Sequence, residues 1–206
     1  MFERFLGRFS RDGAIGCSGE ELLAYIDPLP VGFPDLVIRF AGATFGDGLY
    51  RLYEPNEIAK WTAAATDVFP ELEGRIVCFG MNWLGYQFAL DVQRDEDGEP
   101  LLLMLDPGSA EAVEIPATFV GFHEEIVLDY TDAILGSDLF EEWLAEGHPP
   151  PRPGWCAGCR VQIFLGGADD VSNLELMEAE AFWNRSGRLR ASGAPPADSM
   201  GNARMA

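Results

Sequence analysis

The sequence predicts an α+β fold, in which helices pack around a central and mostly antiparallel sheet. Across residues 84–93 apolar residues alternate with small or polar ones, which is typical of a strand with one buried face. Residues 101–105 form an unbroken apolar run, as expected for a strand that is covered on both sides. The Asp97-Gly98 pair between these strands favours a tight turn, so we expect a central hairpin with an acidic tip.

The segments before this hairpin predict helices and further strands. Residues 18–21 have the pattern of a capping box, with Ser18 as the N-cap of a short helix. Residues 42–48 form a glycine-rich turn that leads into a strand at residues 49–53. Pro55 then opens a helix that ends near Phe69, and residues 75–79 predict a short strand that feeds the hairpin.

After the hairpin we expect one more short strand and two helices. The strand covers residues 113–115. Thr118 is placed to cap a helix whose apolar residues recur at helical spacing as far as Ile134, and Ser137 is placed to cap the next helix. His123 falls on the first of these helices beside two glutamates, where we expect it at the rim of the core.

The chain divides at a proline-rich stretch. Residues 1–146 are expected to form the main domain and residues 147–154 a stiff connector. Residues 155–190 are too few to fold alone, so we expect this extension to dock on the main domain. Within it, the alternation of Val161, Ile163 and Leu165 predicts a strand, and residues 173–189 are expected to be partly helical. The composition of residues 191–206 predicts a disordered tail.

Charge is the most informative global property. The 206 residues include 34 Asp and Glu but only 14 Lys and Arg, so the formal net charge is -20. Such a charge serves solubility, and it also favours a basic partner. Nucleic-acid binding is not expected, because phosphate contacts need clustered Lys and Arg and the sequence shows no such cluster.

The sequence predicts a cytoplasmic protein with no membrane partner. It has no secretory signal at its start and no apolar run near the ~20 residues of a membrane helix. The four cysteines are therefore expected to be reduced.

The sequence contains few candidate catalytic or metal-binding motifs. Cys156 and Cys159 form a C-x-x-C motif, which can be a redox pair or half of a zinc site. The following residues favour a strand rather than the helix of a redox motif, so we favour buried core cysteines and keep a thiol or zinc protein as the alternative. His123 and His148 lie near no nucleophile signature. We therefore expect no enzyme activity, no catalytic residues, no metal and no cofactor.

Five segments together resemble a known family. They are FGDGLYR at 45–51, FGMNWLG at 79–85, FALD at 88–91, DPG at 106–108 and FLGGADDVSNL at 164–174. These segments resemble the bacterial immunity proteins of type VI secretion DNase effectors, whose C-terminal domain is similar to the SUKH superfamily. The last segment is the most specific of the five, and the resemblance spans residues 29–189.

The resemblance implies a SUKH-like immunity protein that binds a cognate toxin and blocks it without catalysis. Since a nuclease is itself basic, strong acidity suits such a partner. We expect acidic loops to cover the toxin's active site around an aromatic anchor at Trp83. The expected toxin-binding residues are Asp95, Glu96, Asp97 and Glu99 at the hairpin tip, with Asp169 and Asp170 in the C-terminal extension. A non-catalytic interaction scaffold is the remaining alternative.

Overall fold

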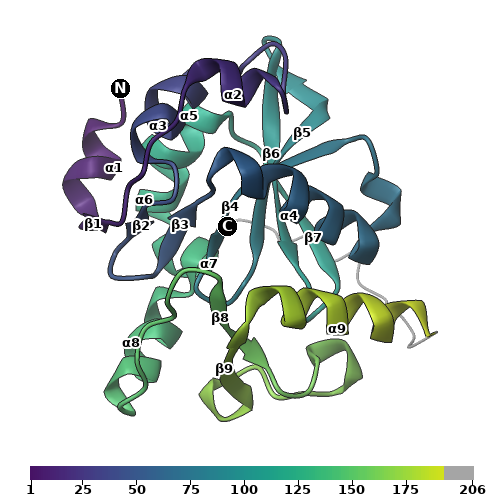
Figure 1. Cartoon of the computed structure of the whole chain (residues 1–206). Coiled ribbons are helices and arrows are strands. Elements are labelled where there is room, and N and C mark those ends of the chain that lie inside the picture. The colour runs from purple at the N-terminus through teal and green to yellow at the C-terminus, as the bar shows by residue number, and fades with distance from the viewer. Residues whose placement is uncertain (193–206) are drawn as a thin grey trace.

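The computed structural model describes residues 1–192, and its centre is a seven-stranded antiparallel sheet with the strand order β1 to β7 (Figure 1). Each strand pairs with the next in the chain, so the sheet is a meander. The α+β prediction, with a central antiparallel sheet and helices around it, is therefore confirmed. The strands are β1 Arg11–Asp12, β2 Thr44–Phe45, β3 Tyr50–Leu52, β4 Ile76–Asn82, β5 Gln87–Glu96, β6 Glu99–Asp106 and β7 Glu111–Ile115.

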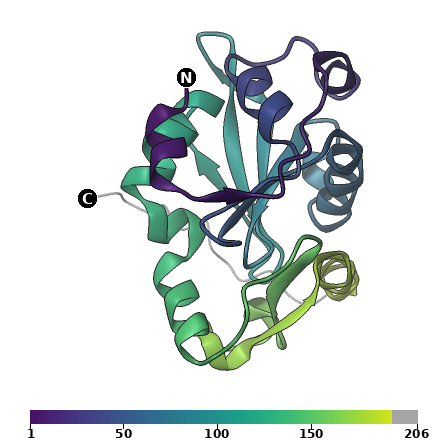
Figure 2. The same cartoon turned by 60° about the vertical axis from the view of Figure 1, so that its left-hand side comes forward.

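Helices cover both faces of this sheet (Figure 2). On one face Thr62 of α4 accepts a hydrogen bond from the Cys78 amide of β4. On the other face Phe122 packs against Phe79 and Phe88 of β4 and β5. The helices are α1 Glu3–Arg8, α2 Gly19–Leu23, α3 Phe33–Phe40, α4 Pro55–Val68, α5 Phe119–Gly121, α6 Val127–Asp129, α7 Thr131–Leu135, α8 Ser137–Ala145 and α9 Ala179–Ala191, with a π-helical turn η2 Phe122–Ile126 and 3-10 turns η1 Pro70–Leu72, η3 Ile163–Leu165 and η4 Val171–Asn173.

Local signals placed the predicted starts of α2 and α5 correctly. Ser18 and Glu21 form the predicted capping box of α2, and Thr118 accepts a hydrogen bond from the Gly121 amide at the start of α5. At α8 the prediction is wrong, because the N-cap is Gly136 and the carboxylate that accepts from the first turn belongs to Asp132.

The extension after the connector packs on the lower end of the main domain (Figure 1). A two-stranded ribbon of β8 Trp155–Cys159 and β9 Leu174–Glu178 leads into α9, which lies against α4. The indole of Trp183 in α9 donates to the Gly85 carbonyl at 2.8 Å, and the Ala157 amide donates to the Trp83 carbonyl at 2.8 Å. The strand predicted at Val161 to Leu165 is wrong, since Ile163–Leu165 is a 3-10 turn. The predicted disordered tail lies, apart from residues 191 and 192, outside the described residues.

Candidate partner-binding surface

The central hairpin has the predicted turn but not the predicted single buried face. Asp97 and Gly98 both have positive φ, 53° and 83°, as a two-residue hairpin turn requires. Gln87, Phe88, Ala89, Leu90 and Asp91 are all buried, whereas Val92 is 50% exposed. The alternation was misleading because the polar positions of β5 have protein partners instead of water: Gln87 accepts from the Tyr53 hydroxyl, and Asp91 accepts from Arg75 and Arg94.

The tip of the hairpin projects beyond its neighbours. Pairing of β5 with β4 ends at Asp91, and pairing of β6 with β7 ends at Leu102, so the hairpin continues to its turn as a two-stranded arm. Three of the expected toxin-binding residues, Asp95, Glu96 and Asp97, are exposed on this arm. Glu99 differs from them, because its carboxylate accepts a hydrogen bond from the Val31 amide at 2.8 Å.

A buried carboxylate anchors the arm to the sheet. Asp91 lies at the base of the arm, and its side chain is fully buried between two arginines, 2.6 Å from Arg75 and 2.7 Å from Arg94. Arg94 also donates to the Leu102 carbonyl of β6 at 2.6 Å. Burial opposes ionisation of Asp91, but the hydrogen bonds from both arginines outweigh it and hold the pKa of this carboxyl below its usual value. Sequence reasoning missed this site, because Asp91 was assigned to a solvent-facing position of the strand.

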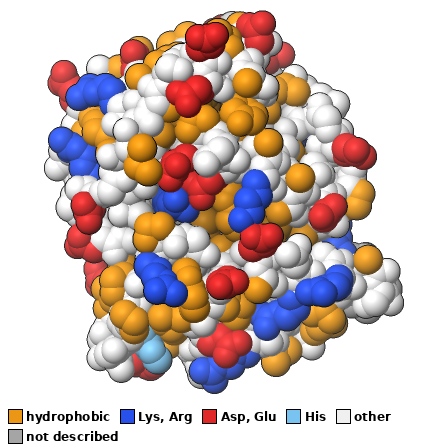
Figure 3. Space-filling view, viewed as in Figure 1, with side chains coloured by type: hydrophobic (Ala, Val, Ile, Leu, Met, Phe, Trp, Pro, Cys, Tyr) orange, Lys and Arg blue, Asp and Glu red, His pale blue; other side chains and the backbone are white. Residues whose placement is uncertain are grey.

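The other expected acids lie at the opposite end of the molecule. Strand β6 runs for eight residues from Glu99 to Asp106, about 25 Å at the usual rise per residue. Just beyond its far end the Gly108 carbonyl accepts from the Phe164 amide of the segment that carries Asp169 and Asp170. The structure therefore does not bring the two acidic groups onto one surface. On the face seen in Figure 3, acidic side chains gather along the upper end, whereas the lower end mixes both signs of charge.

The segment 164–174 is held from inside by one amide side chain. The Asn173 side chain donates to the Val161 and Ala168 carbonyls, each at 2.8 Å, and accepts from the Val161 amide at 3.0 Å. A Cβ on Gly167 would lie 2.0 Å from the Val161 oxygen, so only glycine fits there. Asp170 caps the turn η4 by accepting from the Ser172 amide at 2.9 Å. The glycine, the aspartate and the asparagine of the FLGGADDVSNL segment thus each have a structural role.

This segment forms one wall of a small crevice, which we call the α8 crevice. Leu139 of α8, the turn before β5 and the ribbon strand β8 contribute the other lining residues. The lining is mostly apolar, with Asp169 and Asp170 as its acidic members; the residues are Leu84, Tyr86, Leu139, Ala157, Cys159, Ile163, Ala168, Asp169, Asp170 and Leu174. The structure therefore places two of the expected toxin-binding residues beside apolar side chains.

Trp83 is a core residue and not a surface anchor. Its side chain is 1% exposed and packs against Phe140 and Trp143, with ring centroids 5.0 and 6.0 Å away. The indole nitrogen donates to the Leu135 carbonyl at 3.0 Å. The expectation of an aromatic anchor at this position is wrong, because α7 and α8 fold over the strand end that carries it.

His123 is likewise buried rather than at the rim. It is fully buried among aromatic rings, and its Nδ1 lies 2.9 Å from the Phe119 carbonyl. Because a carbonyl only accepts, Nδ1 carries the proton, and Nε2 accepts from the Tyr50 hydroxyl at 3.0 Å. Burial lowers the pKa of His123 to about 4. The pair joins η2 to β3 inside the core.

The two cysteines of the C-x-x-C motif lie on strand β8. Both are free and buried, and three residues of strand separate their Cα atoms by about 10 Å, beyond the span of a disulfide. Burial raises the pKa of Cys156 and raises that of Cys159 to about 12, the opposite of the shift that activates a thiol. Within residues 1–192 no group of three or more His, Cys, Asp or Glu side chains is placed to hold a metal.

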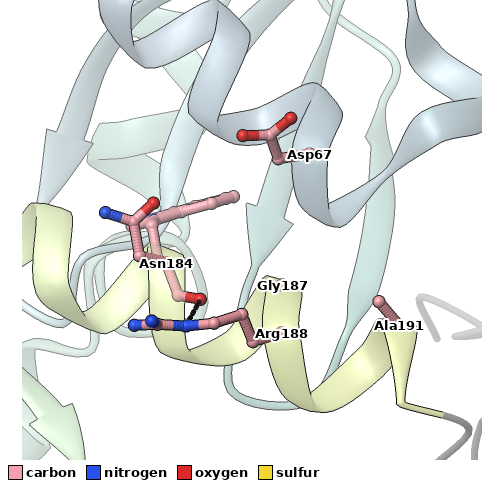
Figure 4. A pocket seen from close by; sticks show the side chains of 6 residues that line it. Asp67, Asn184, Gly187, Arg188 and Ala191 are labelled. Carbon is pink, nitrogen blue, oxygen red and sulfur yellow. Dashed lines mark hydrogen bonds between the residues drawn. The ribbon is translucent and has the colours of Figure 1, made fainter.

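A second hollow lies where α9 crosses the end of α4 (Figure 4). Its lining includes the carboxylate of Asp67, the indole of Trp183 and the side chains of Asn184 and Arg188. Arg188 donates back to the Asn184 carbonyl of its own helix at 3.2 Å. One charge of each sign lines this hollow, so it lacks the uniform acidity of the α8 crevice.

Comparison with known proteins shows a related fold and gives no information on function. No protein-family model matches the chain, and neither does any curated protein. The structure is similar to the crystal structure of Atu4351 from Agrobacterium tumefaciens, with a TM-score of 0.66 and 15% sequence identity over 91% of this chain and 89% of that chain. At this identity the similarity shows a shared fold. In the described part of the chain, no helix is both long enough and apolar enough to cross a bilayer.

Proposed function

We propose that this protein is an immunity protein, which binds a cognate bacterial toxin in the cytoplasm and blocks it without catalysis. The partner we infer is a basic nuclease effector of type VI secretion. The observation that carries the proposal is the construction of segment 164–174. Asn173 and Gly167 fix its backbone from inside, while Asp169 is left exposed at the surface. A rigid, exposed and acidic segment suits a binding surface, because little conformational entropy is lost when a partner docks.

The net charge supports a basic partner. With 34 acidic and 14 basic residues, the protein attracts a cationic partner over distances set by the Debye length. A nuclease presents a cationic cleft to its phosphate substrate, so an acidic protein competes for that surface. Electrostatic attraction of this kind raises the association rate more than it raises the final affinity.

Two separate acidic surfaces are candidates for the contact with the toxin. One is the hairpin arm with Asp95, Glu96 and Asp97, and the other is the α8 crevice with Asp169 and Asp170. Occlusion of the toxin's active site requires only one of them. Trp83 is removed from the proposed surface because of its burial.

Two other functions fit the chain less well. A thiol-redox or zinc protein built on Cys156 and Cys159 is disfavoured by their raised pKa values and by their separation along β8. An interaction scaffold without a toxin remains distinct from immunity, and a toxicity assay separates the two.

The test is co-expression with the product of the adjacent gene in cells that the product kills. Immunity predicts that the protein rescues growth and co-purifies with the toxin. Reversal of charge at one acidic end, either D95K, E96K and D97K together or D169K alone, is expected to weaken the complex and reduce its dependence on salt. The proposal would be refuted if cells that express the toxin grew equally well without the protein, or if the wild-type protein formed no complex with the toxin.

A further inference from the structure

Strand β7 is the outermost strand of the sheet, and among the described residues it pairs only with β6. In an antiparallel pair alternate residues direct their N–H and C=O groups toward the partner strand, so the other residues of β7 direct theirs away from β6. Within residues 1–192, the backbone of residues 112–114 makes no hydrogen bond outside this pairing. The opposite edge of the sheet is shorter, because β1 has two residues and β7 has five. The sheet therefore ends in an unpaired edge at β7.

Neither face of β7 is covered along most of its length. Ala112, Val113 and Glu114 are all exposed, Val113 by 40%. Consecutive residues of a strand point to opposite faces of the sheet, so three consecutive exposed side chains mean that both faces are open. The residues that face them on β6, Leu103 to Leu105, are buried. The protein thus buries β6 and leaves β7 accessible to another chain.

The edge has little protection against pairing with a further strand. Natural edge strands are commonly protected by lysines, prolines or bulges. Strand β7 contains neither Lys nor Pro, and its pairing with β6 shows no register shift. Its charge is acidic instead: the Glu114 side chain is 64% exposed and lies 3.4 Å from Arg94. A glutamate repels an acidic strand and attracts a cationic one, so the edge discriminates between partners by their charge.

We propose that the outer edge of β7 binds a β-strand of a basic protein partner, which extends the sheet by one strand. In this mode of recognition main-chain hydrogen bonds supply affinity, and the side chains that alternate along the strand supply specificity. Lys or Arg opposite Glu114 is the expected match. A second copy of this protein is a poor occupant, because each copy has a net charge of -20. The inference rests on the proposed function only where it takes the toxin as the partner.

Strand β7 runs between the two candidate acidic surfaces. Its Ile115 end pairs with Leu102, where the hairpin arm begins. The turn before its other end contains Gly108, whose carbonyl accepts from the Phe164 amide of segment 164–174. A strand added to β7 therefore extends from one acidic surface toward the other, and basic residues that flank the added strand are placed to reach them.

The test is amide hydrogen exchange of the full chain, followed by NMR with a capped heptapeptide of alternating lysine and valine. It is carried out at about 100 mM NaCl, where the Debye length is about 10 Å. The peptide is expected to slow exchange at alternate residues of β7, and the effect should saturate. A control peptide with N-methyl groups on two neighbouring central residues keeps the charge but has both edges blocked, so it is expected to give no protection. A peptide with glutamate in place of lysine is expected not to bind.

Matched variants separate the edge from the general acidity of the protein. Glu114→Lys reverses the charge beside the edge and is expected to weaken binding of the lysine peptide about fivefold. Glu141→Lys makes the same change at an exposed position of α8. It is expected to change the affinity less than about twofold, because salt screens distant exposed charges. Thermal unfolding checks that both variants fold.

Three results would overturn the proposal. They are equal protection by the two lysine peptides, equal weakening by the two variants, and slow exchange at every residue of β7 before any peptide is added. In the last case another occupant already covers the edge, and sedimentation shows whether it is a second copy. Failure of the edge site leaves the immunity function standing if the wild type rescues growth. Conversely, peptide binding without rescue would refute immunity and leave the edge site.

Discussion

Single residues decide the shape of the segment that carries Asp169. Gly167 has no space for a side chain, because a Cβ there would lie 2.0 Å from the Val161 oxygen and 2.7 Å from the Asn173 side-chain nitrogen. Both atoms belong to the hydrogen bonds that hold the loop. A side chain at this position therefore affects the loop and the α8 crevice together.

Gly167→Ala is expected to lower the free energy of unfolding by about 1–3 kcal/mol, because the backbone of the loop must move to admit the methyl group. Urea unfolding measures the change. Gly7→Ala is the matched control, since a Cβ on this glycine of α1 meets nothing within 4 Å. Equal stability of the two variants would show that the loop yields without cost.

His123 gives the protein a predictable sensitivity to acid. Burial holds its folded pKa at about 4, below the usual 6.5, so only the unfolded chain takes up the proton between these values. Stability is then complete above pH 6.5 and falls as the pH drops toward 4, by about 3 kcal/mol in total. NMR titration of the imidazole is expected to show His123 still neutral at pH 5. A His123 resonance that titrates near 6.5 would contradict this account.

At the scale of elements, the hairpin shows what sequence patterns capture. The turn at Asp97-Gly98 and the capping box at Ser18 are local, so nearby residues alone predict them. Asp91 is paired with Arg94, three positions later, and with Arg75, 16 positions earlier in the chain, and the alternation of apolar and polar residues does not reveal this pairing. Trp83 was misjudged for the same reason, since its cover comes from residues some 50 positions later in the chain. Turns and helix caps were therefore predictable, because short-range contacts determine them. Which side chains are exposed was not predictable, because that depends on contacts between distant segments.

The anchor of the hairpin arm is expected to be important for stability. Asp91→Asn keeps the shape of the side chain but leaves Arg75 and Arg94 without their buried counter-charge, at a cost of about 2–3 kcal/mol. Because the folded pKa of Asp91 is lowered, its contribution is present above the unfolded value and is lost as the pH falls through the folded one. The loss measured at pH 7 should therefore shrink in acid.

Asp95→Asn on the same arm serves as the control for this prediction. Asp95 is exposed, and its carboxylate accepts a hydrogen bond from the Gly98 amide at 3.1 Å. We expect a change below about 1 kcal/mol in urea unfolding. A cost for Asp91→Asn as small as that of the control would mean that the two arginines are stabilised by water instead.

For the whole molecule, the net charge bears both on the proposed basic partner and on stability. Several ion pairs in the described residues are exposed at both partners, and such pairs contribute little. The excess of 34 acidic over 14 basic residues instead acts as a repulsion spread over the surface. An acidic surface of this kind favours association with a cationic partner at the expense of the stability of the free protein.

Salt should therefore stabilise the free protein and weaken its complex. Raising NaCl from about 20 to about 200 mM shortens the Debye length to below about 10 Å and screens the repulsion among the acids. We expect the midpoint of urea unfolding at pH 7.5 to rise, with KCl giving the same effect as NaCl. A fall with added salt would mean that ion pairs outweigh the net repulsion. In that case the excess of acidic residues would not destabilise the free protein. A basic partner would then not be needed to explain why the protein carries so many acidic residues.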